Sequence, residues 1–392
     1  MKMTRETISV PVEPIVLQWL RNSSGWTQAE VSKKLGLQED TYLKIESGER
    51  KPTLRQIELL AKTFHRPVAA FLLSAPAEEP SLPQDFRSIP SDKRPFSRKL
   101  RRVFRRARWL QNSSKELMTN LSLSIEPGIK KHNLSDNPAE IAVQERSASG
   151  INLDVQSKWK NSYEAFAMWH NFLECKNIRT FQISMPIGEA RGFSLTDKKP
   201  YLIVVNSADD INARIFTLFH EYGHILLSET SVCIPELASN KDGSKEASAE
   251  RWCNKFAAEF ILPLETRSQL ATELPVINQS GFWKALNHYS NRFKVSKFAL
   301  LIRMKEFDLI KDVDLTKFIE LLRESEKKKG GVGRGLTQLD RCRQERGNNY
   351  VSLVLGNLDR GLINTRDALD YLSIRMKYLD SLRSRQRGAK ND

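Results

Sequence analysis

The sequence predicts an α+β protein with several domains, because helical and strand-like patterns are segregated along the chain. Residues 15–73 and 135–175 show helical patterns, whereas residues 178–206 alternate apolar and polar positions in the manner of two or three strands. An apolar helix at residues 215–227 follows these strands. The length of 392 residues allows two to four domains, each with its own core.

The amino-terminal part is expected to be an all-α domain, residues 1–75, built from short helices with tight connections. Thr27 is a suitable N-cap for one helix, and Gly36 permits the turn that follows it. A second helix is expected from about residue 38 to residue 46. A further helix at residues 54–64 ends before a proline.

A linker and a basic helix are expected at residues 76–130. After a proline-rich stretch, the segment "SDKRPFSRKLRRVFRRARWLQ" contains nine basic residues and one acidic residue, and its apolar residues have helical spacing. Such a charge run forms either a solvated helix face or a contact surface for a phosphate backbone. The candidate phosphate contacts are Arg101, Arg102, Arg105 and Arg106.

Three polar residues interrupt the apolar helix "IFTLFHEYGHILL". His220 and His224 are four residues apart, so both imidazoles project from one face of the helix and a metal could bridge them. Glu221 lies about 100° round the helix, within reach of a water on that metal but poorly placed to ligate it. The alternative is a chance pair of satisfied core histidines. The apolar setting and the neighbouring Gly223 favour a zinc peptidase helix.

Zinc held by two histidines needs a third protein ligand and an open position. Thr230 stands where a third histidine would complete one known form of this motif, so that form is excluded. The segment "SAERWCNKFAAEFILP" offers Glu250 and Glu259. Nine residues of helix place these two carboxylates on opposite faces, so only one can face the metal.

Composition limits the class of protein. The chain has no apolar run approaching a membrane span, and its start lacks the apolar region of a signal peptide, so we expect a cytoplasmic protein with no membrane partner. Its four cysteines have no paired spacing, which argues against disulfides and against a cysteine zinc site. The net charge of +15 favours a polyanionic partner.

The stretches "TQAEVSKKLGL", "IESGERKPT" and "LAKTF" resemble the Cro/C1-type (XRE) helix-turn-helix family over about 60 residues. The resemblance implies that this domain binds DNA. The residues that it places toward DNA are Gln28, Gln38, Glu39, Thr41, Tyr42 and Lys44. Residues 1–75 carry eleven basic and eight acidic residues, a weak electrostatic footprint, so docking on a protein is the alternative.

The stretches "ARGFSLTDKKPYLIVVNS", "RIFTLFHEYGHILL" and "ERWCNKFAAEFILP" resemble the ImmA/IrrE-like metallopeptidases that carry an amino-terminal XRE domain. "DFRSIP" at residues 85–90 extends this likeness, which reaches to about residue 305. The resemblance implies a zincin-like domain with a small sheet at residues 131–310, whose family activity is proteolysis of a repressor. The residue roles that it implies are zinc ligation by His220, His224 and Glu250, general-base catalysis by Glu221 and a structural role for Glu259.

The last part of the chain, residues 311–392, is expected to be a small helical module, with Thr365 as a helix cap. The sequence thus predicts a zinc endopeptidase with its own DNA-binding domain. The expected partners are DNA, a protein substrate such as a repressor, and a second copy of the chain in a homodimer. The alternative is a DNA-binding regulator whose peptidase fold is a non-catalytic sensor or dimerisation platform.

Overall fold

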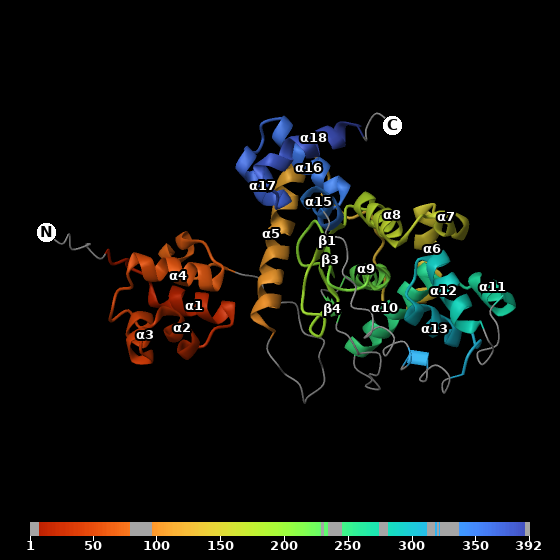
Figure 1. Cartoon of the computed structure of the whole chain (residues 1–392), viewed down its shortest axis with the longest axis horizontal. Coiled ribbons are helices and arrows are strands. Elements are labelled where there is room, and N and C mark those ends of the chain that lie inside the picture. The colour runs from red at the N-terminus through yellow and green to blue at the C-terminus, as the bar shows by residue number, and fades with distance from the viewer. Residues whose placement is uncertain are drawn as a thin grey trace. The chain divides into compact units, whose positions relative to one another are not determined.

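A computed structural model describes most of the chain (Figure 1). The described residues are 8–78, 96–228, 231–233, 245–273, 281–311, 318–319, 321 and 337–388. They divide into two compact units: residues 8–78 with residues 96–106 form the first, and the described residues from 107 onward form the second. Thr230 and the segment at residues 85–90 lie outside the described residues. No described helix is both long and apolar enough to cross a membrane.

The first unit begins with a group of short helices. They are α1 (Pro14–Ser24), α2 (Gln28–Leu35), α3 (Glu39–Glu46), α4 (Leu54–Phe64) and the 3-10 helix η1 (Val68–Leu72). The helix starts follow from local sequence, since Thr27 and Thr53 each form a capping box with the residue three positions later. Gly36 adopts a left-handed conformation with φ of 67° at the turn between α2 and α3, as the sequence predicts.

The helix α5 (Arg98–Asn120) starts in the first unit. Its buried residues Leu100, Val103 and Phe104 recur at three- and four-residue spacing, so this stretch is amphipathic. The guanidinium of Arg98 lies 3.8 Å from the ring centroid of Trp26 and forms an ion pair with Glu30. The first turns of α5 are therefore an additional helix of the first unit.

Arg105 joins α5 to the ends of two other helices. Its guanidinium donates to the backbone oxygens of Ser23, at 3.3 Å, and Phe64, at 3.2 Å. These carbonyls lie in the last turns of α1 and α4, where backbone acceptors have no partner within the helix and the helix dipole favours positive charge. Arg105 therefore satisfies two helix carboxyl termini together.

The second unit contains the rest of α5, a small sheet and the remaining helices. Before and around the sheet lie α6 (Pro138–Ser149), α7 (Leu153–Lys158), α8 (Ser162–Cys175), α9 (Ile211–Leu226) and α10 (Lys245–Ile261). After them come α11 (Thr266–Glu273), α12 (Phe282–Phe293), α13 (Lys297–Glu306), α15 (Gln338–Arg346), α16 (Asn348–Asp359), α17 (Thr365–Leu372), η3 (Met376–Tyr378) and α18 (Leu379–Gly388). The prediction of an α+β fold is confirmed.

The sheet has the strand order β1-β3-β2-β4. Its strands are β1 (Arg179–Ile183), β2 (Gly192–Leu195), β3 (Leu202–Asn206) and β4 (Ser231–Cys233). β1 runs parallel to β3, whereas β2 is antiparallel to both β3 and β4. The three strands before α9 match the expected alternating segment, and all their residues except Ile183 are buried. Apolar residues of β3, α8, α9 and α10 belong to one hydrophobic core.

The carboxyl-terminal helices pack into this same unit, with α15 next to β1 (Figure 1). The side chain of Gln182 on β1 donates to the backbone oxygen of Gln344 at 2.5 Å, and the ring of Tyr350 packs edge-on against Phe181. Gly347, with φ of 78°, leaves space for the ring of His170. These helices thus share a compact unit with the sheet. A functionally separate module at residues 311–392 stays a prediction.

We expect Arg105→Gln to lower the stability of the first unit by about 1 kcal/mol, because hydrogen bonds to two helix-terminal carbonyls lose their charged donor. Hydrogen exchange of the α1 and α4 amides in the full chain would measure this loss. Arg55→Gln, an exposed change on α4, is the matched control. Equal protection in the two variants would show that Arg105 does not hold these helix ends.

Candidate metal centre

The helix α9 carries the two histidines and Glu221 into the core of the second unit. Asp210 caps its start by accepting a hydrogen bond from the backbone amide of Asn212. His220 is almost fully enclosed, and Glu221 and His224 have no exposed surface. Uncompensated polar groups are costly at such depth, so a stable protein needs partners for them.

The neighbouring helix α10 approaches α9 closely at Gly223. A Cβ atom at this position would lie 3.2 Å from Cα and 3.1 Å from Sγ of Cys253, which is tighter than an ordinary contact. Glycine therefore allows the two helices to pack in direct backbone contact. Because Glu250 is one turn before Cys253 on α10, this contact brings its carboxylate to the two imidazoles.

Among the described residues, one group of His, Cys, Asp and Glu side chains converges closely enough to hold a metal ion: His220, His224 and Glu250, with ligand atoms within 4.8 Å of one another. The Nε2 atoms of the histidines are 3.2 Å apart. One Glu250 oxygen lies 3.2 Å from Nε2 of His220, and the other lies 3.1 Å from Nε2 of His224. Two imidazole nitrogens and a carboxylate are a donor set that a divalent metal accepts.

The ionisation of Glu250 fits a ligand role. Burial by itself raises the pKa of this carboxyl, but when His220 and His224 are protonated their charge and hydrogen bonds outweigh burial and lower the pKa below its ordinary value. The side chain is therefore an ionised carboxylate, which is the form that binds metals.

Glu259 lies on the opposite face of α10, as its nine-residue distance from Glu250 predicts. One of its oxygens accepts from the backbone amide of Leu264 at 2.7 Å, and the other pairs with the buried guanidinium of Arg303. Arg303 also donates to the backbone oxygen of Leu262. Glu259 thus holds the chain at the end of α10, and of the two candidate carboxylates the structure brings only Glu250 to the histidines.

Asn254 belongs to the site although no sequence motif indicated it. Its side-chain oxygen lies 3.0 Å from Nδ1 of His220 and accepts the proton on that nitrogen, which leaves Nε2 free to act as a ligand. Asn254 is four residues after Glu250 on α10, so both side chains project from the same helix face. The four-residue spacing from Glu250 could have indicated Asn254 as a site residue. It does so only when the packing of α10 against α9 is known.

Glu221 is completely buried and is not among the three converging ligands. Strand β2 lies against it at Gly192, where a Cβ atom would be 3.5 Å from Cγ of Glu221 and 2.5 Å from the methyl group of Thr217. A side chain at position 192 would therefore collide with α9. Glycine is required there for the strand to pass beside the glutamate.

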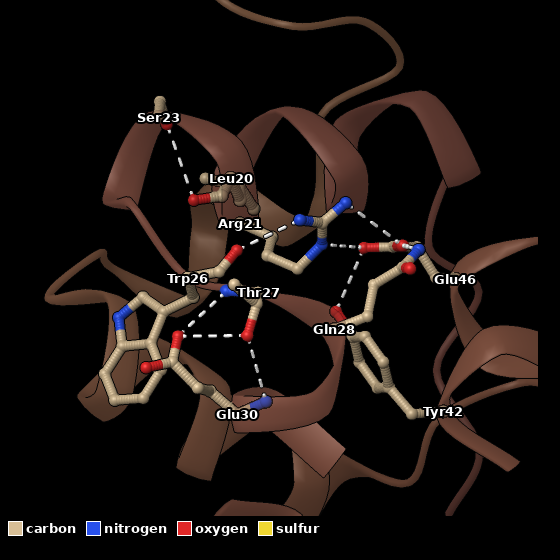
Figure 2. Close-up of polar contacts among 9 residues, drawn as sticks. All are labelled: Leu20, Arg21, Ser23, Trp26, Thr27, Gln28, Glu30, Tyr42 and Glu46. Atoms are coloured by element: carbon tan, nitrogen blue, oxygen red, sulfur yellow. Dashed lines mark hydrogen bonds and ion pairs between the residues drawn. The ribbon is translucent and has the colours of Figure 1, made fainter. Parts of the chain in front are cut away.

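In the first unit, a network around Glu46 connects α1, α2 and α3 (Figure 2). Its oxygens accept from Nε of Arg21 at 2.6 Å, from Nε2 of Gln28 at 2.5 Å and from the hydroxyl of Tyr42 at 3.1 Å. Arg21 also donates to the backbone oxygen of Trp26. The network orients Gln28 at the start of α2 and holds α3 in place.

The expectation that Tyr42 faces DNA is wrong. Tyr42 has 0% exposed surface and packs in the core with Ile45, so it does not reach a partner. The reason is helical spacing, since Tyr42 and Ile45 lie on the inner side of α3. Gln38 and Lys44 are exposed and Thr41 is half-buried, so these three remain on accessible parts of α3 and its amino-terminal cap. Their contacts with DNA stay predictions.

The acidic residues at the start of α3 have a structural explanation. Glu39 and Asp40 occupy its first turn, and no side chain caps this helix end. Negative charge there is stabilised by the helix dipole.

The expected phosphate contacts on α5 differ in their surroundings. Arg105 donates to backbone oxygens of the first unit, and Arg101 donates to the backbone oxygen of Phe96. Arg102 is exposed, and its Nη1 atom lies 2.7 Å from Nε2 of His65. Arg106 is half-buried. Arg101 and Arg105 thus stabilise the fold through hydrogen bonds to backbone oxygens. Contact with phosphate stays a prediction for all four arginines.

Family comparisons identify two domains in the chain. Residues 173–305 match the IrrE N-terminal-like domain, which is a metallopeptidase-type family, and residues 17–71 match a helix-turn-helix model. These matches confirm the architecture implied by the sequence resemblance, an XRE-type helix-turn-helix domain joined to an ImmA/IrrE-like peptidase domain. The chain therefore carries a helix-turn-helix domain and a metallopeptidase-type domain. No curated protein matches it.

We expect Asn254→Ala to weaken zinc binding about 10- to 100-fold, because His220 loses the acceptor that fixes its ring. Glu250→Ala removes a ligand and should weaken binding more. Competition with a chromophoric chelator would give both affinities. Ser248→Ala, a change elsewhere on α10, is the control. Zinc affinity of Asn254→Ala equal to that of the wild type would remove Asn254 from the site.

Proposed function

We propose that this protein is a zinc-dependent endopeptidase with its own DNA-binding domain. The observation that carries the proposal is the buried convergence of His220, His224 and Glu250, with Glu221 on the same helix turn. A purely structural core would not need three such groups at one point, since two imidazoles and a carboxylate are costly to bury. Zinc is favoured by this nitrogen and oxygen donor set.

Each residue of the site has a distinct proposed role in peptide hydrolysis. Zinc held by the three ligands would supply Lewis-acid polarisation of a carbonyl group and of water. Asn254 keeps the ring of His220 in one orientation. Glu221 would take a proton from the attacking water and pass it to the amine that leaves when the peptide bond breaks. The enclosure of Glu221 limits its contact with bulk water, and its Cγ atom lies beside Gly192 of strand β2.

The proposed substrate is a regulatory protein, such as a transcriptional repressor. The likeness to ImmA/IrrE-like peptidases supports this substrate class, and the helix-turn-helix domain supports a role in transcription. In this account the DNA-binding unit would bring the peptidase to promoters where its substrate is bound. A substrate backbone could add by β-pairing at β4, the last strand in the order of the sheet and a neighbour of α9.

DNA would be contacted by α2, α3 and the adjoining cap, through Gln28, Gln38, Thr41 and Lys44. The exposure of Gln38 and Lys44 supports this surface, as does the orientation of Gln28 by Glu46. Arg102, exposed on α5, is the best placed of the four α5 arginines for an additional phosphate contact.

We expect Glu221→Gln to abolish cleavage, with a loss of several orders of magnitude, while zinc binding and folding persist. The amide keeps the shape of the side chain but cannot accept the proton. The measurement is the level of a candidate repressor in cells under inducing conditions, in strains with wild type, Glu221→Gln or the exposed control Glu265→Gln. The repressor should disappear with wild type and control only.

Equal loss of the repressor with wild type and Glu221→Gln, at matched zinc occupancy, would end the peptidase proposal. A regulator whose peptidase fold is a non-catalytic sensor would then be the better account.

We expect Lys44→Gln to reduce affinity for the preferred DNA site about tenfold, because a cation is lost from the surface of α3. The site would first be found by selecting random duplex DNA with the full chain, and affinities would then be measured at several salt concentrations. Lys62→Gln, an exposed change on α4, is the control. Selection that enriches no sequence would favour the alternative in which this domain docks on a protein.

A further inference from the structure

A cleft of about 360 Å³ lies between α15 and the carboxyl-terminal end of α17, in the second unit. The described residues that line it are Gln338, Arg341, Cys342, Glu345, Leu372, Ser373 and Arg375. Its volume is at the lower end of the range of small-molecule sites, roughly 300–1,000 Å³. Neither the metal ligands nor the proposed DNA-contacting residues belong to this cleft.

The walls of the cleft are tied together by hydrogen bonds. Gln338 donates to the backbone oxygen of Ser373 at 3.4 Å, and the thiol of Cys342 donates to the backbone oxygen of Leu372 at 3.4 Å. Both bonds run from α15 to the end of α17. The spacing of the two walls is therefore set before any ligand arrives, which lowers the cost of binding.

The sheet supports α15 from the other side. Gln182 on β1 donates to the backbone oxygen of Gln344, and Arg214 on α9 donates to the side-chain oxygen of Gln182 at 2.8 Å. This chain of contacts links the cleft helix to the helix that carries the metal ligands. The cleft thus has a firm base in the peptidase-like domain.

The charge of the cleft is mainly positive. Arg341 and Arg375 are both exposed, and neither forms an ion pair within the described part of the chain. Glu345 is the acidic residue among the lining residues, and burial raises the pKa of its carboxyl, although Arg346 and Arg341 act in the opposite direction. The lining thus contains two guanidinium groups and one carboxyl whose charge is disfavoured by burial.

A third arginine lies behind the wall. Arg346 is 6% exposed and donates from Nη2 to the hydroxyl of Ser373, a lining residue, at 3.1 Å. Its Nε and Nη1 groups have no hydrogen-bond acceptor among the described residues. A buried guanidinium with unmet donors calls for a compensating anion or water nearby.

The thiol in the cleft is not a reactive group. Burial raises the pKa of Cys342 to about 11, so the thiol stays protonated at neutral pH. A ligand of this cleft would therefore be held by non-covalent contacts.

We propose that this cleft is a binding site for a small organic anion that carries a phosphate or carboxylate group. The oxyanion would lie between Arg341 and Arg375, which suit such groups because guanidinium donors match their geometry. The remainder of the molecule would lie against Leu372 and the thiol of Cys342, with Gln338 and Ser373 as polar contacts. This site is separate from peptide hydrolysis and from DNA binding.

The test is calorimetric titration of the full chain with phenyl phosphate, benzoate and phenol. The double variant Arg341→Gln/Arg375→Gln removes both cations from the cleft. Arg360→Gln/Arg366→Gln makes the same charge change at two exposed positions that do not line the cleft and serves as the control. Phenyl phosphate and benzoate distinguish the two oxyanions, and phenol has the apolar ring without the charge.

We expect wild type and control to bind at least one of the two anions with equal affinity and to bind phenol much more weakly. The cleft variant should lose at least tenfold in affinity for the anion that binds. Three outcomes would each overturn the proposal: no binding of either anion by the wild type at about 1 mM, which corresponds to roughly −4 kcal/mol, equal affinity in the cleft variant, or an equal loss in the control variant.

Discussion

The contact between α9 and α10 at Gly223 is the constraint on which the candidate metal centre depends. Direct backbone packing at this point sets the distance from Glu250 to the two imidazoles, and the same register puts Asn254 against the other nitrogen of His220. A larger residue at position 223 would move α10 away and separate the donors. The requirements of close packing and of metal ligation thus meet in one glycine.

Buried charge is managed differently in each part of the molecule. Around Glu46, Arg21 neutralises the carboxylate, and Gln28 and Tyr42 donate further hydrogen bonds to it, which fixes the arrangement of the helix-turn-helix core. At the end of α10, one guanidinium, that of Arg303, binds two acceptors: the carboxylate of Glu259 and the backbone oxygen of Leu262. At His220, His224 and Glu250, two imidazole nitrogens and both oxygens of one carboxylate converge, which is the arrangement that a cation would complete.

The basic segment at the start of α5 illustrates why net charge alone does not assign a partner. Arg98 and Arg105 are bound to acceptors within their own unit, where they stabilise an added helix. Helix carboxyl termini attract cations just as phosphates do, since both present oxygen acceptors and negative potential. An arginine-rich helix can therefore serve its own fold and still leave a residue such as Arg102 exposed.

The sequence by itself determined the features that depend on neighbours along the chain. Capping boxes at Thr27 and Thr53, the left-handed turn at Gly36 and the common face of His220 and His224 all follow from local spacing, and the structure has these features. Family likeness, confirmed over residues 17–71 and 173–305, added the order of the two domains.

Only the tertiary structure decided which groups meet across the fold. Helical geometry placed Glu250 and Glu259 on opposite faces, but the packing of α10 on α9 selected Glu250 and gave Asn254 its contact. In the same way, the packing of α3 against neighbouring helices determines which of its sides is buried. Tyr42, which was expected to face DNA, lies in the core. Long-range contacts of this kind depend on how elements pack, and periodicity within one element carries no information about its partner.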